Sequence, residues 1–326
     1  MHVVAGDIGG TSARLALYEV SAQVPRLLAR RTYASRDHAG VEPVLSAFLA
    51  EAGIRPDAIA LGVAGPVRDG TCRATNLPWV IAAESVAAAT GIARVRLLND
   101  LEAAAWGIDA VEDDHRVVLH TGRAGVRGNQ SVVAAGTGFG EAGRVWSGDR
   151  YVPFASEGGH ADFAPTDEIG YAYHRWMAQR HGHVSWDRVV SGPGLVSLHD
   201  FLRDRTGGRA PGWLADDLAS GDPAAAIARA GLERTDAVCD EALGRFVRLF
   251  GAEAGNHALK LMALGGVYVT GGIAPKILPR LKEGAFVDAF LDKGRMRPVV
   301  ADMPVTVILD GDTALKGAAI CASSAL

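Results

Sequence analysis

Glycine-rich turns that close apolar segments are the first places where this sequence could do chemistry. The stretch GDIGGT ends an apolar run that begins at Val3, and it comprises Gly6, Asp7, Ile8, Gly9, Gly10 and Thr11. Two successive glycines let backbone N–H groups approach an anion closely, and the Thr11 hydroxyl can join them. The Asp7 carboxylate would repel phosphate unless a cation lay between them, and Mg²⁺ held largely through water would remove that conflict. The alternative is a plain hairpin turn with an Asp cap.

The same construction recurs twice further along the chain. The stretch VVAAGTGFG at 132–140 resembles VVAGDIGGT at 3–11, and its turn consists of Gly136, Thr137 and Gly138. A third apolar run ends in Gly271 and Gly272, which offer a flat backbone surface for a base or ribose. Each glycine pair alone is weak, because such pairs are common at strand ends in α/β proteins. Together they suggest a bound nucleotide, while the absence of a Walker motif or a helix-opening GxGxxG disfavours those nucleotide folds.

Three polar groups could bind a neutral polyol. Asn99 and Asp100 stand where a buried strand is followed by a helix, although a helix N-cap would explain them equally well. Glu157 and His160 flank a glycine pair, so that a tight loop could direct both at one ligand; a solvated loop is the alternative. Asp187 precedes the SGPG stretch at 191–194, and it could instead be an exposed ion-pair partner of Arg188.

The elements that must position these residues read as two α/β blocks. Alternating apolar runs and helical spacing predict β-β-β-α-β-α-β-α for residues 1–110, and a hairpin then restarts the order. Helix-rich sequence follows from 169 to 263, with a break expected at Gly192-Pro193-Gly194. Strands are expected at 267–270 and 305–309, before a terminal helix at 313–322. The predicted domains are 1–110 with 303–326, and 111–302.

Length and composition limit the functions that remain. A chain of 326 residues suggests about two domains, and 48% hydrophobic with 21% charged residues is typical of a globular protein. The net charge of −4 has no basic block, which gives no support to nucleic-acid binding. Three scattered cysteines form neither a CxxC pair nor a disulfide framework. With no signal peptide or membrane span in the pattern, we expect a cytoplasmic protein.

In combination the motifs resemble those of the bacterial glucokinases. GDIGGT at 6–11, LLND at 97–100, AAGTGFG at 134–140, EGGH at 157–160, SGPGL at 191–195 and GGI at 271–273 follow in that family's order over nearly the full length. The resemblance implies the hexokinase/actin-like superfold: two RNase-H-like α/β domains with an interdomain cleft, the first completed by the C-terminal helix. It also implies glucose, ATP and Mg²⁺ as ligands, and a homodimer.

The resemblance further implies roles for individual residues. Asp100 would be the general base that takes the proton from the sugar 6-hydroxyl. This role agrees with phosphoryl transfer, in which the protein mainly positions the nucleophile and offsets the phosphate charge. Asn99, Glu157, His160 and Asp187 would bind the other hydroxyls. The turns at 6–11, 136–138 and 271–272 would hold ATP, with Asp7 near Mg²⁺ through water. The chain departs from the family at Ser12, where Asn is usual, and at Asp187, where the family has the longer Glu.

Other functions compatible with parts of this pattern remain alternatives. A broader hexokinase, or a sugar kinase of the repressor/ORF/kinase type, is closest, although the latter typically carries a Cys-rich zinc segment. A sugar-sensing repressor would need an N-terminal DNA-binding helix-turn-helix, whereas a strand is expected from residue 3. An actin-like ATPase would share the nucleotide fold alone, and the polar pairs at 99–100 and 157–160 disfavour it.

Overall fold

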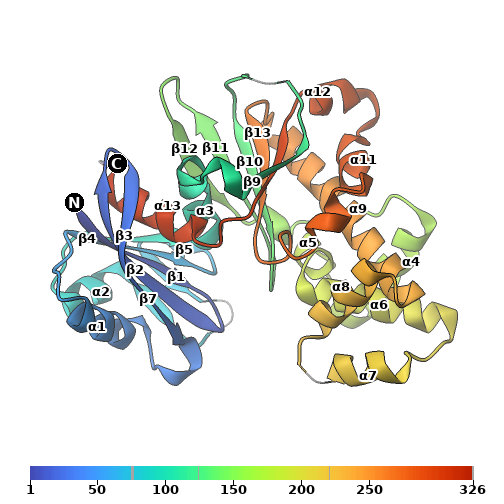
Figure 1. Ribbon diagram of the computed structural model, residues 1–326, viewed down its shortest axis with the longest axis horizontal. Helices are drawn as coiled ribbons and strands as arrows, with labels where there is room; N and C mark the ends of the chain where they lie inside the picture. The colour runs from blue at the N-terminus through green and yellow to red at the C-terminus, as the bar shows by residue number, and fades with distance from the viewer. Residues whose placement is uncertain (75–76, 124, 220, 325–326) are drawn as a thin grey trace. The chain divides into compact units, whose positions relative to one another are not determined.

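The computed structural model describes residues 1–74, 77–123, 125–219 and 221–324, and it shows a mixed α/β fold (Figure 1). Two compact units divide the chain. The first comprises 1–115, 152–155 and 310–326, and the second comprises 116–151 and 156–309. Residues 325–326, which the predicted first domain included, lie outside the described residues.

The first unit is built on a five-stranded sheet of order β3-β2-β1-β4-β8. The strands are β1 (His2–Ile8), β2 (Ser12–Ser21), β3 (Val24–Ala34), β4 (Ala58–Val63) and β8 (Val95–Asn99). β1 pairs antiparallel with β2 and parallel with β4, which in turn is parallel to β8. Every residue of β4 is buried, which explains why its apolar run does not alternate with polar residues. The carboxyl ends of β1, β4 and β8 therefore lie at the same edge of the sheet.

Helices cover both faces of this sheet (Figure 1). On one face, α1 (Val41–Ala52) and α2 (Ala83–Thr90) bury Phe48 and Val86 against the strands. On the other, α13 (Thr313–Ser323) packs against α3 (Asp100–Gly107). The unit also contains a three-stranded sheet of β5 (Val67–Arg68), β6 (Thr71–Arg73) and β7 (Val80–Ala82), which the apolar runs did not predict.

The contact between α3 and α13 depends on glycine. A Cβ at Gly317 would collide with the carbonyl oxygen of Ala103, and a Cβ at Gly107 would collide with that of Thr313. Neither glycine has a positive φ, so its role is to admit a neighbouring backbone and not to make a turn. α3 begins at Asp100, so this contact also supports the helix that carries a candidate site residue.

The second unit is built on a six-stranded sheet of order β12-β11-β10-β13-β14-β9, although residues 152–155 of the edge strand β12 group with the first unit. Its strands are β9 (Arg116–His120), β10 (Gln130–Ala135), β11 (Phe139–Trp146), β12 (Tyr151–Ser156), β13 (Gly266–Thr270) and β14 (Val305–Ile308). β10 is antiparallel to β11 and parallel to β13. This repeats the β2-β1-β4 arrangement of the first unit, with a loop of Gly and Thr residues between the hairpin strands in each case.

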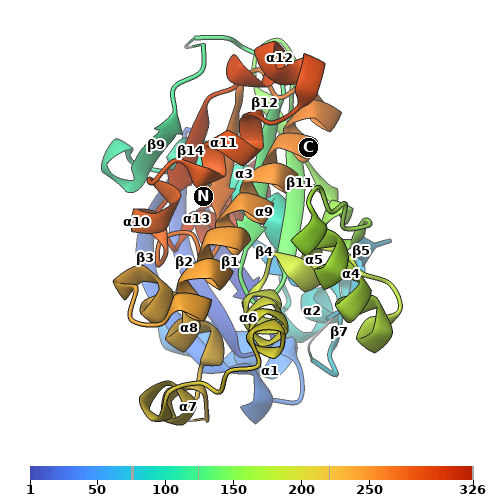
Figure 2. The ribbon, with the colours of Figure 1, turned by 90° about the vertical axis from the view of Figure 1, so that its right-hand side faces the viewer.

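The long helix α9 (Ala237–Leu261) forms the centre of the second unit's helical layer and contacts β10 (Figure 2). Its buried residues Phe246 and Phe250 belong to the larger hydrophobic core. The other helices of this unit are α4 (Glu168–His181), α5 (Trp186–Val189), α6 (Gly192–Thr206), α7 (Gly212–Ala219), α8 (Pro223–Glu233), α10 (Leu278–Leu281), α11 (Ala285–Leu291) and α12 (Arg297–Ala301). The break expected at Gly192-Pro193-Gly194 lies just before these residues, between α5 and α6. Gly192 and Pro193 themselves begin α6, since Pro is compatible with the first helical turn.

The return to the first unit comes later than the predicted boundary at residue 303. β14 pairs with β13 and β9, so it belongs to the second unit, and the first unit resumes at Asp310. The difference arises because a short buried strand carries no mark of which sheet it joins. Among the described residues, no helix is long and apolar enough to cross a membrane.

Candidate active site

The structure gathers the predicted site residues of the first unit at the carboxyl edge of its parallel strands. β1 ends at Ile8, β4 pairs with it up to Val63, and Val63 is in turn paired with Asn99 of β8. The turn of Gly9, Gly10 and Thr11 follows β1, and Asp100 follows β8. Ser35 supports this turn by donating its hydroxyl to Gly9 O at 2.9 Å and its N–H to Thr11 O at 3.1 Å.

Asn99 and Asp100 have different structural positions. Asn99 is the buried N-cap of α3, and its Oδ1 accepts hydrogen bonds from the N–H groups of Leu101 and Glu102, at 2.9 and 3.4 Å. Its Nδ2 donates to Gly65 O at 3.3 Å. Asp100 is the first helical residue and half-buried, with Oδ1 accepting from Leu101 N at 2.8 Å. The capping alternative therefore applies to Asn99, and the Asp100 carboxylate lies at a helix N-terminus, where negative charge is favoured.

Asp7 is ion-paired with Arg14, which lies outside the sequence motifs. Arg14 Nη2 and Nε lie 2.5 and 3.0 Å from Asp7 Oδ2, and Arg14 Nη1 donates to Gly311 O at 2.9 Å. The two residues are cross-strand partners in the β1–β2 pairing, so the hairpin register was the signal that could have identified the pair. Arg14 thus compensates the negative charge of Asp7, the charge for which the sequence suggested a Mg²⁺ ion. Asp7 Oδ1 remains for a hydrated Mg²⁺, and an outer-shell contact through water fits this donor set.

In the second unit, two backbone hydrogen bonds hold the turn of Gly136, Thr137 and Gly138. Gly136 N donates to Gly138 O across the turn at 2.8 Å, and Gly192 N at the start of α6 donates to Gly136 O at 2.8 Å. Gly271 has φ of +91°, and a Cβ there would lie 2.5 Å from Ala135 O, so glycine is required for β13 to end beside this turn. Gly272 has open space around it. These glycines thus lie together at one edge of the sheet.

Asp187 also contacts this turn. Its Oδ1 accepts a hydrogen bond from Phe139 N at 2.7 Å, and a Cβ at Gly138 would lie 2.6 Å from the same oxygen. Arg188 is directed to His181 Nδ1, at 3.2 Å, and not to Asp187. One carboxylate oxygen of Asp187 therefore stabilises the start of β11, and Oδ2 is the atom with which it could bind a sugar.

Glu157 and His160 are carried by a tight turn that follows β12 and packs against β11. The 3₁₀ segment Gly158–His160 packs so closely that a Cβ at Gly159 would collide with Phe139 O. Glu157 Oε2 and His160 Nε2 are 3.8 Å apart, and both side chains are about half exposed. The two groups that the sequence paired therefore lie side by side and can contact one small ligand.

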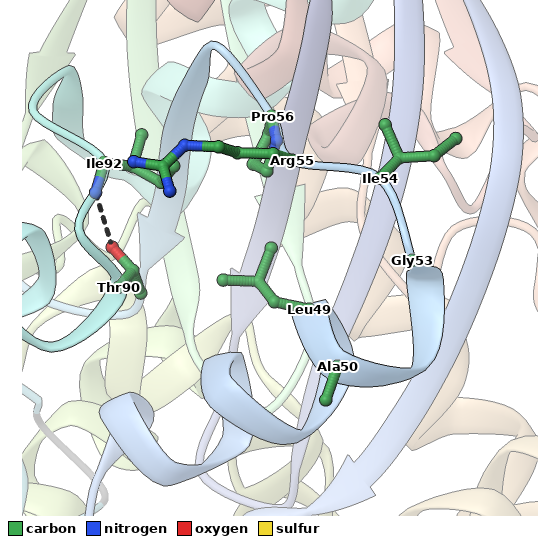
Figure 3. A pocket seen from close by; sticks show the side chains of 8 residues that line it. All are labelled: Leu49, Ala50, Gly53, Ile54, Arg55, Pro56, Thr90 and Ile92. Atoms are coloured by element: carbon green, nitrogen blue, oxygen red, sulfur yellow. Dashed lines mark hydrogen bonds between the residues drawn. The ribbon is translucent and has the colours of Figure 1, made fainter.

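The described part of the first unit also has a hollow away from these residues (Figure 3). It has a volume of about 410 Å³ and lies beside the C-terminal ends of α1 and α2. Its lining includes Leu49, Ile54 and Ile92, with the Arg55 guanidinium donating to Gly91 O at 2.7 Å. None of the predicted site residues lines it, so it is separate from the candidate active site.

Substitution of Asp187 separates its two possible contacts. If Oδ2 binds glucose, Asp187→Ala should raise the glucose KM roughly 5- to 150-fold, because a sugar hydroxyl loses its hydrogen-bond partner. This factor corresponds to a loss of about 1–3 kcal/mol of binding free energy. If Asp187 serves the turn alone, the ATP KM should rise and the glucose KM should stay the same. Steady-state kinetics with each substrate varied would measure this. Arg188→Ala is the matched control, for which a change below about 0.5 kcal/mol is expected.

Comparisons with known proteins agree over nearly the whole chain. A family model described as Glucokinase matches residues 4–325. The glucokinase of Nostoc punctiforme is 38% identical, with 98% of each chain covered. A glucokinase crystal structure from an Antarctic psychrotroph has a TM-score of 0.83 at 30% identity and covers 98% of both chains. A ROK-family glucokinase from Streptomyces griseus, solved with glucose and AMPPNP, has a TM-score of 0.66 at 22% identity, a likeness of fold alone.

Proposed function

The chain belongs to the glucokinase family and is an enzyme that phosphorylates glucose with ATP, and we propose that Asp100 is the general base of this reaction. In this role its carboxylate takes the proton of the glucose 6-hydroxyl as that oxygen attacks the terminal phosphorus of ATP. The observation that supports this assignment is that Asn99 and Asp100 have different structural positions. Asn99 is the N-cap of α3, and the Asp100 carboxylate lies at the helix N-terminus with Oδ1 accepting from Leu101 N.

The other predicted residues bind the two substrates in this proposal. Glu157, His160, Asn99 and Asp187 Oδ2 bind sugar hydroxyls, each of which both donates and accepts hydrogen bonds. The N–H groups of the turns at 6–11 and 136–138 bind phosphate oxygens, and the backbone at 271–272 lies along the nucleoside. The support is that each unit presents its turn at the carboxyl edge of parallel strands, where α/β proteins commonly bind ligands.

Mg²⁺ accompanies ATP in this proposal and supplies positive charge to the transferred phosphoryl group. Asp7 would hold it through water by Oδ1, because Arg14 occupies Oδ2. Arg14 fixes the Asp7 side chain and lowers the net negative charge beside the turn at 9–11. We also propose that the two units are RNase-H-like domains that close a cleft on the substrates. We further propose that the protein is a homodimer and that it is located in the cytoplasm.

A coupled assay of ADP formation would test the proposed activity. Purified protein and MgATP are mixed with glucose, mannose, fructose or glucosamine, and ADP and polyphosphate replace ATP in parallel reactions. We expect the highest kcat/KM with glucose and ATP, and ATP hydrolysis without sugar that is far slower than sugar phosphorylation, since water must be kept from the phosphoryl group. Rapid ATP hydrolysis that no sugar accelerates would contradict the proposal and favour an actin-like ATPase.

A further inference from the structure

A pair of buried glutamates lies directly behind the turn that carries Glu157 and His160. Glu141 is on β11 and Glu253 is on α9, and their exposed fractions are 1% and 0%. The two carboxyl groups face each other at hydrogen-bonding range. Two ionised carboxylates cannot form a hydrogen bond, because each offers acceptors alone. Glu141 Oε1 finds no donor among the described residues, as expected of an oxygen that itself carries the proton.

The donors around the pair are divided unequally, because those with printed contacts to a carboxylate oxygen at hydrogen-bonding distance lie beside Glu253. Lys260 Nζ lies 3.3 Å from Glu253 Oε1, and Asn256 Nδ2 donates to Oε2 at 2.8 Å. His257 is also on α9, with Nε2 3.7 Å from Glu141 Oε2 and Nδ1 2.7 Å from Ser131 Oγ. Burial and the nearby Lys260 lower the pKa of His257 to about 4, so His257 is neutral and brings no positive charge to Glu141.

Burial and the facing Glu253 raise the pKa of Glu141 to about 8, and Lys260 opposes this in part. Lys293, beyond α11, interacts with Glu253, and burial lowers the pKa of its ammonium. Glu157 and His160, which flank the two glycines, are the ionisable side chains of the turn. A carboxyl whose pKa is higher in the folded than in the unfolded chain stabilises the fold below its unfolded value of about 4.5. That contribution is lost as the pH rises through about 8.

Glu141 forms the surface on which the turn rests. A Cβ at Gly158 would collide with Glu141 Oε2, and a Cβ at Gly159 would collide with the backbone oxygen of Phe139 on the same strand. Gly158 N is held by Ser156 Oγ at 2.9 Å, and Ala161 N by Gly158 O at 2.9 Å. The Glu141 carboxyl therefore lies directly against Gly158, where there is no room for a side chain.

We propose that Glu141 is a positioning residue for the sugar: as a neutral acid that shares its proton with Glu253, it supports Gly158–Gly159 and so fixes Glu157 and His160. The inference rests on the proposed function, in which those two side chains bind glucose. Loss of the proton leaves two carboxylates in one buried site. Their repulsion then moves Glu141 Oε2 against Gly158, and the turn shifts.

The test compares the wild type with Glu141→Gln, whose amide has nearly the same shape and stays neutral at every pH. If the protonated form alone binds glucose well, the wild-type glucose KM should rise about tenfold between about pH 7 and about pH 9, because the competent fraction falls by that factor. The KM should stay flat in Glu141→Gln. The ATP KM, measured in the same assays, should not follow this change. Equal pH dependence of the glucose KM in both proteins would overturn the proposal.

A second measurement needs no turnover. Infrared spectroscopy in H₂O and D₂O should show the C=O stretch of a buried protonated carboxyl in the wild type at neutral pH. The band should vanish above about pH 8 and be missing from Glu141→Gln. A missing band in the wild type refutes the neutral acid. A band that titrates while the glucose KM stays flat refutes the positioning role, whereas absence of glucose phosphorylation with the band intact refutes the proposed function instead.

Discussion

Asp100→Asn is expected to lower kcat by at least ~100-fold, because the amide cannot accept the proton of the 6-hydroxyl. Glucose should still bind within about tenfold of the wild-type affinity, since the amide keeps most of the hydrogen-bonding capacity. The substitution should not disturb α3: Asn99 provides the cap, and an Asn at 100 can still accept from Leu101 N. Steady-state kinetics gives kcat, and calorimetric titration with glucose gives the affinity.

Asp114→Asn is the matched control, because it makes the same chemical change at an exposed aspartate outside the proposed site. Its kcat should equal that of the wild type. Near-normal turnover of a folded Asp100→Asn protein would show that the reaction needs no base at this position. A loss of glucose binding equal to the loss of kcat/KM would mean that Asp100 binds the sugar and does not act on its proton.

Gly317→Ala is expected to destabilise the first unit by about 1–3 kcal/mol or more, the usual range for overpacking. The new methyl group would collide with Ala103 O, and no flexible side chain can move aside to admit it. α3 and α13 must then separate, which also displaces Asp100 at the start of α3. Thermal unfolding should show a lower Tm, and glucose phosphorylation should fall in the protein that remains folded.

Gly212→Ala is the control for this substitution, because Gly212 is also helical and has nothing within 4 Å of its would-be Cβ. Alanine favours a helix over glycine, so Tm should stay the same or rise slightly. An unchanged Tm in Gly317→Ala would mean that the two helices are not in backbone contact as described.

The local elements and the site motifs were within reach of the sequence. The glycine turns at 9–11 and 136–138 do follow strands, as the apolar runs before them indicated, and the terminal helix begins at the predicted Thr313. The family resemblance was confirmed over residues 4–325. These features depend on short-range patterns, in which hydrophobic periodicity and turn residues carry the information.

Features that depend on distant contacts could not be predicted in the same way. β14 shows no local sign that it pairs with β13 and β9. The Gly317 contact with Ala103 and the Glu141–Glu253 pair bring together residues far apart in the chain. Arg14 was the exception, since a hairpin with the observed register places it opposite Asp7. The motif assigned Asp187 to the sugar, but only the structure shows that Phe139 N occupies one of its oxygens.

Phosphoryl transfer from ATP to the glucose 6-hydroxyl is tested most directly by ³¹P NMR of one reaction mixture. Wild-type protein with MgATP and glucose should yield ADP and glucose 6-phosphate in equal amounts, with no inorganic phosphate beyond a slow background. Omission of glucose should leave ATP intact over the same period. Formation of inorganic phosphate in place of the sugar phosphate, or ADP formation at the same rate without glucose, would contradict the account.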